Sequence, residues 1–126
     1  MWQDRASTRF PKTARLTSPA DFKRVFDNPV KSSDACFTLL ARKNDRGHPR
    51  LGLAISKKHA KRAVDRNRLK RLVRESFRMN QANMRDLDIV VLARQGTSER
   101  SAQELRASLA KHWSRVVERC EKSSSS

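Results

Sequence analysis

The sequence has few of the features that a membrane protein or a nucleotide-binding enzyme needs. It contains three glycines in 126 residues, so it has no glycine-rich loop to cradle a phosphate. No stretch approaches the roughly 18 consecutive apolar residues that cross a bilayer, and no apolar run follows the first five residues. We therefore expect a cytoplasmic protein without a secretory signal and without a membrane partner.

Cysteine is also scarce. Cys36 and Cys120 are far apart in the sequence, and neither has a partner at metal-ligand spacing. This usage is typical of reduced thiols in a reducing compartment. It predicts no metal site and no cofactor bound by the chain itself.

The residues of a catalytic centre are missing as well. His48, His59 and His112 are scattered, with no partner at a useful spacing. Asp86 and Asp88 are close together, but they flank a junction between a loop and a strand, where acidic residues are typical of a turn. We expect no catalytic residues in this chain.

Charge of one sign is abundant. Lys and Arg number 29 against 13 acidic residues, which gives a net charge of +16. Such an imbalance destabilises the compact state by self-repulsion, and a polyanionic partner relieves it. Nucleic acid is favoured over an anionic membrane surface.

The pattern along the chain predicts a basic N-terminal arm (1–14), one RNA-binding domain (15–120) and a disordered serine tail (121–126). Ser18 and Pro19 begin a short helix that ends at Asn28. Residues 35–42 and 51–56 are predicted to form a hairpin, and residues 88–94 a strand buried on both faces. A basic helix (59–82) and an amphipathic last helix, begun by a capping box of Ser101 and Glu104, complete the order. This order predicts an α+β fold, a two-layer α/β sandwich with a small mixed sheet.

The basic helix is the most informative segment. Ten Lys and Arg residues lie between Lys57 and Arg78, and only Asp65 and Glu75 oppose them. One helical face carries an apolar stripe (Leu69, Leu72, Val73, Phe77), and another carries a polar stripe (Asn67, Arg71, Arg74, Arg78). A solvated face normally mixes charges of both signs, whereas the polar stripe does not. Because the planar fork of Arg grips phosphate bidentately, the stripe predicts contact with a nucleic-acid backbone.

The same segment resembles the bacterial ribonuclease P protein family. The resemblance rests on Ser56-Lys57-Lys58 and on residues 63–78, around the Arg66-Asn67-Arg68 element, and it extends from about residue 15 to residue 120. It implies a fold similar to a domain of ribosomal protein S5, with a left-handed β-α-β crossover. Elementary strand chirality alone would favour the right-handed form, which prevails in about 98% of cases.

The resemblance also implies a function. Family members are the protein subunit of ribonuclease P, a ribonucleoprotein that cleaves precursor tRNA to give the mature 5′ end. The catalytic RNA carries the active site and its Mg²⁺, and the protein binds that RNA and the single-stranded 5′ leader. The residues that match the catalytic-RNA-binding positions are Arg66, Asn67, Arg68, Lys70, Arg71, Arg74 and Arg78, and those that match the leader cleft are Phe22, Phe26, Lys57 and Lys58.

The sequence leaves open how the aromatic residues near the expected leader cleft are used. Phe22 and Phe26, spaced i, i+4 on a capped helix, are typical of core packing, although an aromatic face also stacks on any base. Phe37 and Leu40 lie on opposite faces of their strand, so at most one of them faces the cleft.

Two other protein classes compete with the family reading. A ribosomal protein is also small, basic and cytosolic, so composition does not separate it from a ribonuclease P subunit. A DNA-binding domain would place the basic helix in a major groove. Recognition helices mix in residues that read base edges, whereas here Asn67 stands alone among Arg and Lys. The helix therefore favours backbone contact, and no DNA partner is expected.

Overall fold

The structure is a computed structural model that describes residues 15, 16, 18–44, 46–58, 60–84 and 86–125, with side chains as far as residue 121. The predicted arm at 1–14 and His59 lie outside the described residues. The elements are α2 (Pro19–Phe26), β1 (Val30–Ser33), β2 (Phe37–Lys43), β3 (Arg50–Ala54), α3 (Ala63–Asn80), β4 (Leu87–Ala93) and α4 (Ala102–Ser125), with short 3-10 turns η2 (Gln81–Asn83) and η3 (Thr97–Glu99).

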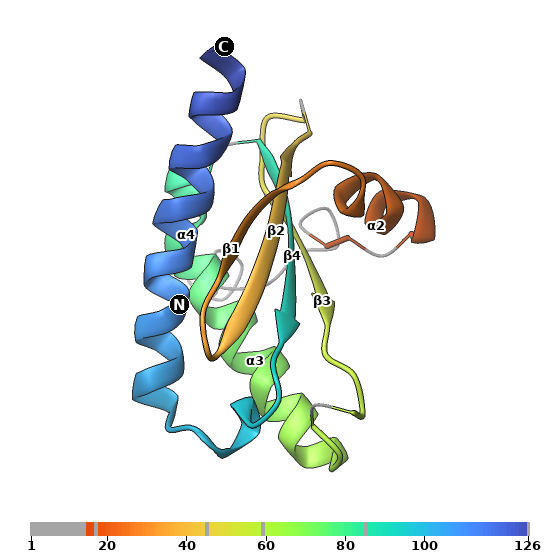
Figure 1. The fold of residues 1–126 in the computed structure, drawn as a ribbon, viewed down its shortest axis with the longest axis vertical. Coiled ribbons are helices and arrows are strands. Elements are labelled where there is room, and N and C mark those ends of the chain that lie inside the picture. The colour runs from red at the N-terminus through yellow and green to blue at the C-terminus, as the bar shows by residue number, and fades with distance from the viewer. Residues whose placement is uncertain (1–14, 17, 45, 59, 85, 126) are drawn as a thin grey trace, which may run out of the picture.

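The four strands form one mixed sheet in the order β1-β2-β4-β3 (Figure 1). β2 is antiparallel to β1 and β4, with Leu39 opposite Val91, whereas β3 is parallel to β4, with Leu51 opposite Ile89. The sequence predicted a hairpin of residues 35–42 with residues 51–56, which correspond to β2 and β3. This prediction is wrong, because β4 lies between those two strands. β4 is the most apolar strand and is buried on both faces as predicted, so it lies inside the sheet, between β2 and β3. β1 was missed because its four residues, VKSS, carry little strand signal.

The crossover from β3 through α3 to β4 is left-handed. In Figure 1 both strands run downward, β4 lies to the left of β3, and α3 lies behind the sheet. This is the handedness that the family resemblance implied, against the general preference for right-handed crossovers.

The alternating side chains of β4 divide the core into two parts. Ile89 and Val91 belong to a large cluster that packs under α3 and α4, and this layer with the sheet forms the expected sandwich. Val90 points to the opposite face, where it packs with Leu16 and with Val25 of α2. The short helix α2 is thereby held on the face that α3 and α4 leave uncovered.

Helix ends follow the sequence closely at α2 and less closely at α4. Ser18 caps α2 by accepting a hydrogen bond from the Asp21 amide (3.1 Å), and Ser101 accepts one from the Glu104 amide (3.1 Å), as predicted. Helix α4, however, extends to Ser125, so residues 121–125 are helical where a disordered tail was expected. No glycine or proline occurs between Thr97 and Ser126 to end the helix.

A buried polar cluster fastens α4 to the β1–β2 hairpin. The Ser32 hydroxyl lies 2.7 Å from Nδ1 of His112, and the Ser108 hydroxyl donates to Oδ2 of Asp34 (2.7 Å). Nε2 of His112 lies 3.1 Å from Oδ1 of Asp34 but is not aligned for a hydrogen bond. His112 is therefore a fully buried part of the packing, not a surface group.

Candidate nucleic-acid interface

The two stripes predicted on the basic helix are both present on α3. Leu69, Leu72, Val73 and Phe77 are buried in the large core. Asn67, Arg71 and Arg74 are exposed, and Arg78 is half-buried. At 100° per residue the polar stripe lies on the side of the helix opposite the apolar one. One side of α3 is thus fixed to the core, while the other presents a row of guanidinium groups.

The two arginines that flank Asn67 make contacts within the protein. Nη1 of Arg66 donates to the carbonyl oxygens of Ala60 (2.9 Å) and Lys61 (2.8 Å), just before α3 begins. Arg68 donates on the other side of the helix, from Nη1 to Ser98 O (3.2 Å) and from Nη2 to Arg100 O (3.1 Å). These bonds anchor the start of α3 to the loops on either side of it. No local pattern in the sequence indicated this anchoring role.

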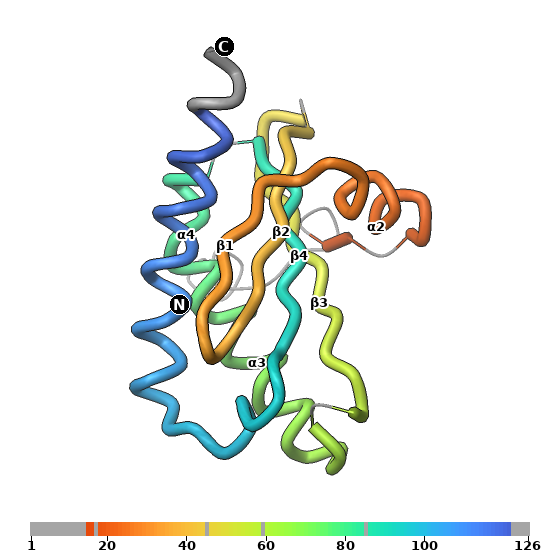
Figure 2. Tube along the Cα trace, in the orientation of Figure 1, coloured from red at the N-terminus to blue at the C-terminus, as the bar shows by residue number. Residues whose placement is uncertain are grey.

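The predicted leader-binding residues come from two separate elements. Phe22 and Phe26 are on α2, and the Phe22 ring lies against Gly52 in the middle of β3, while Lys57 and Lys58 are exposed in the turn that follows β3. Figure 2 shows α2 beside the upper part of the sheet and the turn after β3 at its lower end. Phe22 is half-buried against the small core, whereas Phe26 is 46% exposed. The interpretation of Phe22 as a core residue is therefore confirmed in part, whereas Phe26 presents an aromatic face to solvent.

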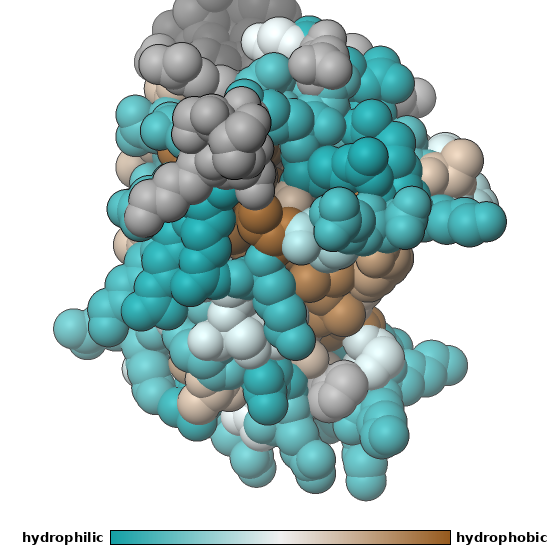
Figure 3. Space-filling model, turned by 45° about the horizontal axis from the view of Figure 1, so that its top comes forward, coloured by the Kyte–Doolittle hydropathy of each residue, from teal (hydrophilic) through white to brown (hydrophobic). Residues whose placement is uncertain are grey.

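The sheet face beside α2 is partly open and apolar. Leu40, Ala54 and Leu92 are only partly buried there, and Figure 3 shows an apolar patch surrounded by hydrophilic side chains. Phe37 is fully buried on the other face, under α3 and α4. Of the two β2 residues that were in question, Leu40 is thus the one on the α2 face of the sheet, where the leader cleft is expected.

A buried carboxylate holds α2 in place over this face. Asp88 of β4 is fully buried and accepts hydrogen bonds from Arg50 Nε (2.8 Å), Asn44 Nδ2 (2.7 Å) and Arg24 Nη2 (2.8 Å). Burial alone would raise the pKa of Asp88, but these donors outweigh it and hold the pKa below the ordinary value of an aspartate. Asp88 was expected to be a turn residue at the strand start. It is instead the centre of an ionic network, which the apolar pattern of β4 concealed.

A hollow of about 330 Å³ opens at the outer edge of β3, between α2 and α3. Its lining combines apolar and basic side chains, namely Arg15, Leu16, Phe22, Leu51, Leu53, Lys70 and Arg74. Burial, followed by the proximity of Arg15, lowers the pKa of Arg74. The structure thus brings Phe22, a predicted leader residue, together with Lys70 and Arg74, which were predicted to contact the catalytic RNA.

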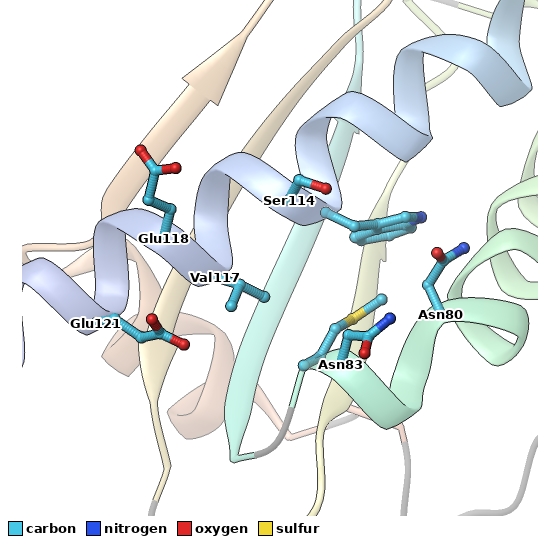
Figure 4. A pocket seen from close by; sticks show the side chains of 8 residues that line it. Asn80, Asn83, Ser114, Val117, Glu118 and Glu121 are labelled. Atoms are coloured by element: carbon cyan, nitrogen blue, oxygen red, sulfur yellow. The ribbon is translucent and has the colours of Figure 1, made fainter.

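A second hollow of about 330 Å³ lies between the end of α3 and α4 (Figure 4). Its lining includes Asn80, Asn83, Glu118 and Glu121 and contains no Lys or Arg. Because carboxylates repel a phosphate backbone, this hollow does not belong to a nucleic-acid interface.

Within the described part of the chain, no group of three or more His, Cys, Asp or Glu is arranged to hold a metal ion. Among the same residues, no helix is both long and apolar enough to cross a bilayer.

Comparison with known proteins decides the family. The model of the family described as "Ribonuclease P" matches residues 10–117. The chain belongs to the ribonuclease P protein family. It is 55% identical, over 117 residues, to the ribonuclease P protein component of Methylococcus capsulatus, covering 92% of this chain and 91% of that one. It is 44% identical to the component of Pseudoalteromonas translucida, covering 88% and 79%.

Solved structures of ribonuclease P proteins share the fold. A Staphylococcus aureus ribonuclease P protein, a mutant described as defective in mRNA degradation activity, has a TM-score of 0.76 at 28% identity and covers 95% of both chains. The Thermotoga maritima protein has a TM-score of 0.73 at 34% identity and covers 81% of this chain and 96% of its own. The α+β fold expected from the sequence is therefore the fold of the family.

Proposed function

We propose that this chain is the protein subunit of ribonuclease P, which assists removal of the 5′ leader from precursor tRNA. The observation that carries the proposal is the outward-facing polar stripe of α3, which begins at Asn67 of the Arg66-Asn67-Arg68 element, in a chain that matches the ribonuclease P family model. Its partners are the ribonuclease P RNA and precursor tRNA, and the protein works in the cytoplasm. RNA is favoured over DNA because the stripe is suited to backbone contact, not to base readout.

In this proposal catalysis belongs to the RNA. The RNA holds the Mg²⁺ ions and the active site, and the protein binds no cofactor of its own. Asn67, Lys70, Arg71, Arg74 and Arg78, with Arg66 and Arg68 at the start of the helix, contact the catalytic RNA. Each phosphate contact releases condensed counterions, so binding is expected to weaken steeply with salt.

The leader binds across the sheet face beside α2. Phe22 and Phe26 of α2 border this face, Lys57 and Lys58 follow β3 in the next turn, and the apolar side chains of Leu40 and Leu92 form its floor. Stacking on an aromatic face tolerates any base, which suits leaders that differ in sequence. The basic turn supplies phosphate contacts at the far end.

A cleavage assay at low Mg²⁺ tests the proposal. Precursor tRNA is incubated with the protein alone, with bacterial ribonuclease P RNA alone, and with both. Cleavage that appears only in the mixture is the expected result, and cleavage by the protein alone would move the active site to this chain. If the protein binds RNA tightly but never stimulates cleavage, the subunit role is wrong.

The rival reading, a ribosomal protein, predicts a different co-purifying RNA. A single abundant RNA of a few hundred nucleotides should accompany a ribonuclease P subunit when the protein is isolated from cells. Predominant recovery of ribosomal RNA would favour the rival.

A further inference from the structure

The hollow between the end of α3 and α4 has no part in the proposed function, yet it is lined like a binding site. Its floor is apolar, because Met84 and Trp113 are 1% and 3% exposed and Val117 is partly buried. Its rim is polar and consists of the exposed residues Asn83, Ser114, Glu118 and Glu121, with the half-buried Asn80. Its volume of about 330 Å³ lies at the small end of the range for ligand pockets. The hollow is therefore large enough for a small molecule with an apolar body.

Contacts between α3 and α4 hold the floor of the hollow rigidly. Nε1 of Trp113 donates to the Ser76 hydroxyl (2.8 Å), and the indole meets the ring of Phe77 edge-on, with the centroids 6.0 Å apart. Because these contacts fix the indole, the apolar floor is in place before a ligand arrives. A preformed site of this kind loses little conformational entropy when it binds.

Oxygen acceptors lie at both ends of this floor. On α3, Nδ2 of Asn80 donates to Ser76 O (2.8 Å), which leaves Oδ1 of Asn80 as an acceptor without a donor among the residues that the structure describes. On α4, the Glu121 carboxylate has no hydrogen-bond or ion-pair partner within the same part of the chain. Figure 4 shows Asn80 and Glu121 at opposite ends of the hollow.

The hollow is negative although the protein is strongly positive. The chain carries a net charge of +16, but the lining contains Glu118 and Glu121 and no Lys or Arg. The hollow also lies at the carboxyl end of α3, where the helix dipole favours a cation. An anion is repelled at this place, whereas a cation with an apolar body matches both the rim and the floor.

We propose that this hollow binds a small aliphatic diammonium ion, with its carbon chain on the apolar floor, one ammonium group at the Glu121 carboxylate and the other at Oδ1 of Asn80. An ammonium group has three donors and no acceptor, so it suits a rim that offers oxygen acceptors at both ends. A metal ion suits the hollow less well. Within the described residues, no three His, Cys, Asp or Glu are grouped to hold one, and the floor offers no oxygen ligand.

The test is a calorimetric titration of the full chain, free of RNA, with putrescine at low salt. One saturable site is expected, because the positive field of the protein opposes binding of a cation elsewhere. The diol with the same carbon chain lacks the charges and should not bind measurably. Absence of saturable putrescine binding, or equal binding of the diol, would overturn the proposal. Displacement of putrescine by an equal concentration of Mg²⁺ would indicate a metal site and would also reject it.

One pair of variants tests the carboxylate of the rim. Glu121→Gln removes an exposed charge from the hollow and should weaken putrescine binding about three- to fivefold. The matched control is Glu104→Gln, which removes the same charge from the exposed first turn of the same helix and should leave the affinity unchanged. Equal affinities of the two variants would exclude Glu121 from the site.

A second pair of variants tests the hollow itself. Ser114→Lys places an ammonium group of the protein at the rim and should abolish putrescine binding. Ala107→Lys adds the same charge at an exposed position of α4 that does not line the hollow, and it should bind nearly as well as the unaltered protein. Both positions are exposed, so both variants should keep the melting temperature of the unaltered protein. Undiminished binding by Ser114→Lys, or equal losses in the two variants, would place the diamine outside the hollow.

Discussion

Arg50 and Asp88 form a doubly hydrogen-bonded ion pair beneath α2. Nε and Nη2 of Arg50 donate to Oδ1 (2.8 Å) and Oδ2 (2.7 Å) of Asp88, and the two side chains are 8% and 0% exposed. Arg24 adds a third cationic donor from α2 itself. The pair therefore links the edge strand β3 and its neighbour β4 to the helix that carries the proposed leader-binding aromatics.

Loss of the Asp88 charge is expected to destabilise the fold strongly. Removing one partner of a buried pair leaves the other charge uncompensated and typically costs about 3–5 kcal/mol. Asp88→Asn should therefore lower the free energy of unfolding in urea by about that much. Asp65→Asn, in the solvent-exposed pair with Arg62, is the control and should change little; equal losses in the two variants would contradict the buried-pair account.

Acid should weaken the fold through two carboxylates. Burial opposes the effect, but amide donors from Phe37 and Cys36, the Ser108 hydroxyl and the nearby His112 ring hold the pKa of Asp34 well below 3.8, and the pKa of Asp88 is also lowered. A depressed folded-state pKa contributes stability that is complete above the unfolded value and is lost as pH falls below it.

Urea unfolding followed from about pH 5 to about pH 2 measures this loss. The double variant Asp34→Asn with Asp88→Asn is less stable throughout but should show a smaller decline over this interval. A decline as steep as that of the unaltered protein would assign acid sensitivity to other groups.

Arginines on α3 are expected to separate into two kinds. Arg71→Ala with Arg74→Ala removes exposed side chains and should leave the melting temperature nearly unchanged, while lowering the salt slope of catalytic-RNA binding by about 0.9 per lost duplex contact. Arg68→Ala breaks two bonds to carbonyl oxygens and should cost roughly 1 kcal/mol of stability. Thermal unfolding and filter binding over a salt series measure both effects. An unchanged slope for the double variant would remove Arg71 and Arg74 from the interface.

The two phenylalanines of α2 are also expected to differ, because replacing Phe26 should affect only RNA binding, whereas replacing Phe22 should affect both RNA binding and stability. Phe26 is 46% exposed, so Phe26→Ala should fold normally and weaken binding of precursor tRNA more than of mature tRNA. Phe22→Ala should impair the same discrimination and also lower stability, because the ring packs against the small core. Equal weakening for precursor and mature tRNA by Phe26→Ala would exclude this ring from the leader site.

Cys120 is expected to be chemically inert in the folded protein. Burial raises the pKa of its thiol to about 11, so the reactive thiolate is scarce near neutral pH. Alkylation at about pH 8 should be slow in buffer and fast in urea. An added thiol at exposed Ala110 of the same helix (Ala110→Cys) gives the rate for an accessible cysteine. Native labelling of Cys120 as fast as that control would mean that the last turns of α4 open readily.

Local patterns were enough to predict much of this protein. The two stripes of α3, the caps at Ser18 and Ser101, and the buried strand β4 follow from residue spacing, because helices and strands repeat with fixed periods. The long Arg-Asn-Arg segment resembled one family, and its fold followed. Charge predicted a polyanionic partner without any reference to the fold.

Other features depended on residues distant in the sequence. No local signal indicated that β4 separates β2 from β3, that Asp88 meets Arg50 and Arg24, or that Arg68 reaches the carbonyls near η3. Nor did any pattern place Arg15 and Phe22 beside Lys70 and Arg74 at one strand edge.

The sequence by itself thus determined most of the elements, their buried faces and the basic character of the surface, since these depend on neighbours within a few residues. Only the tertiary structure decided which strands pair, which arginines are engaged by carbonyls and which side chains share a hollow. Those outcomes depend on how the apolar faces pack together, and the packing of one element is settled only when the others are in place.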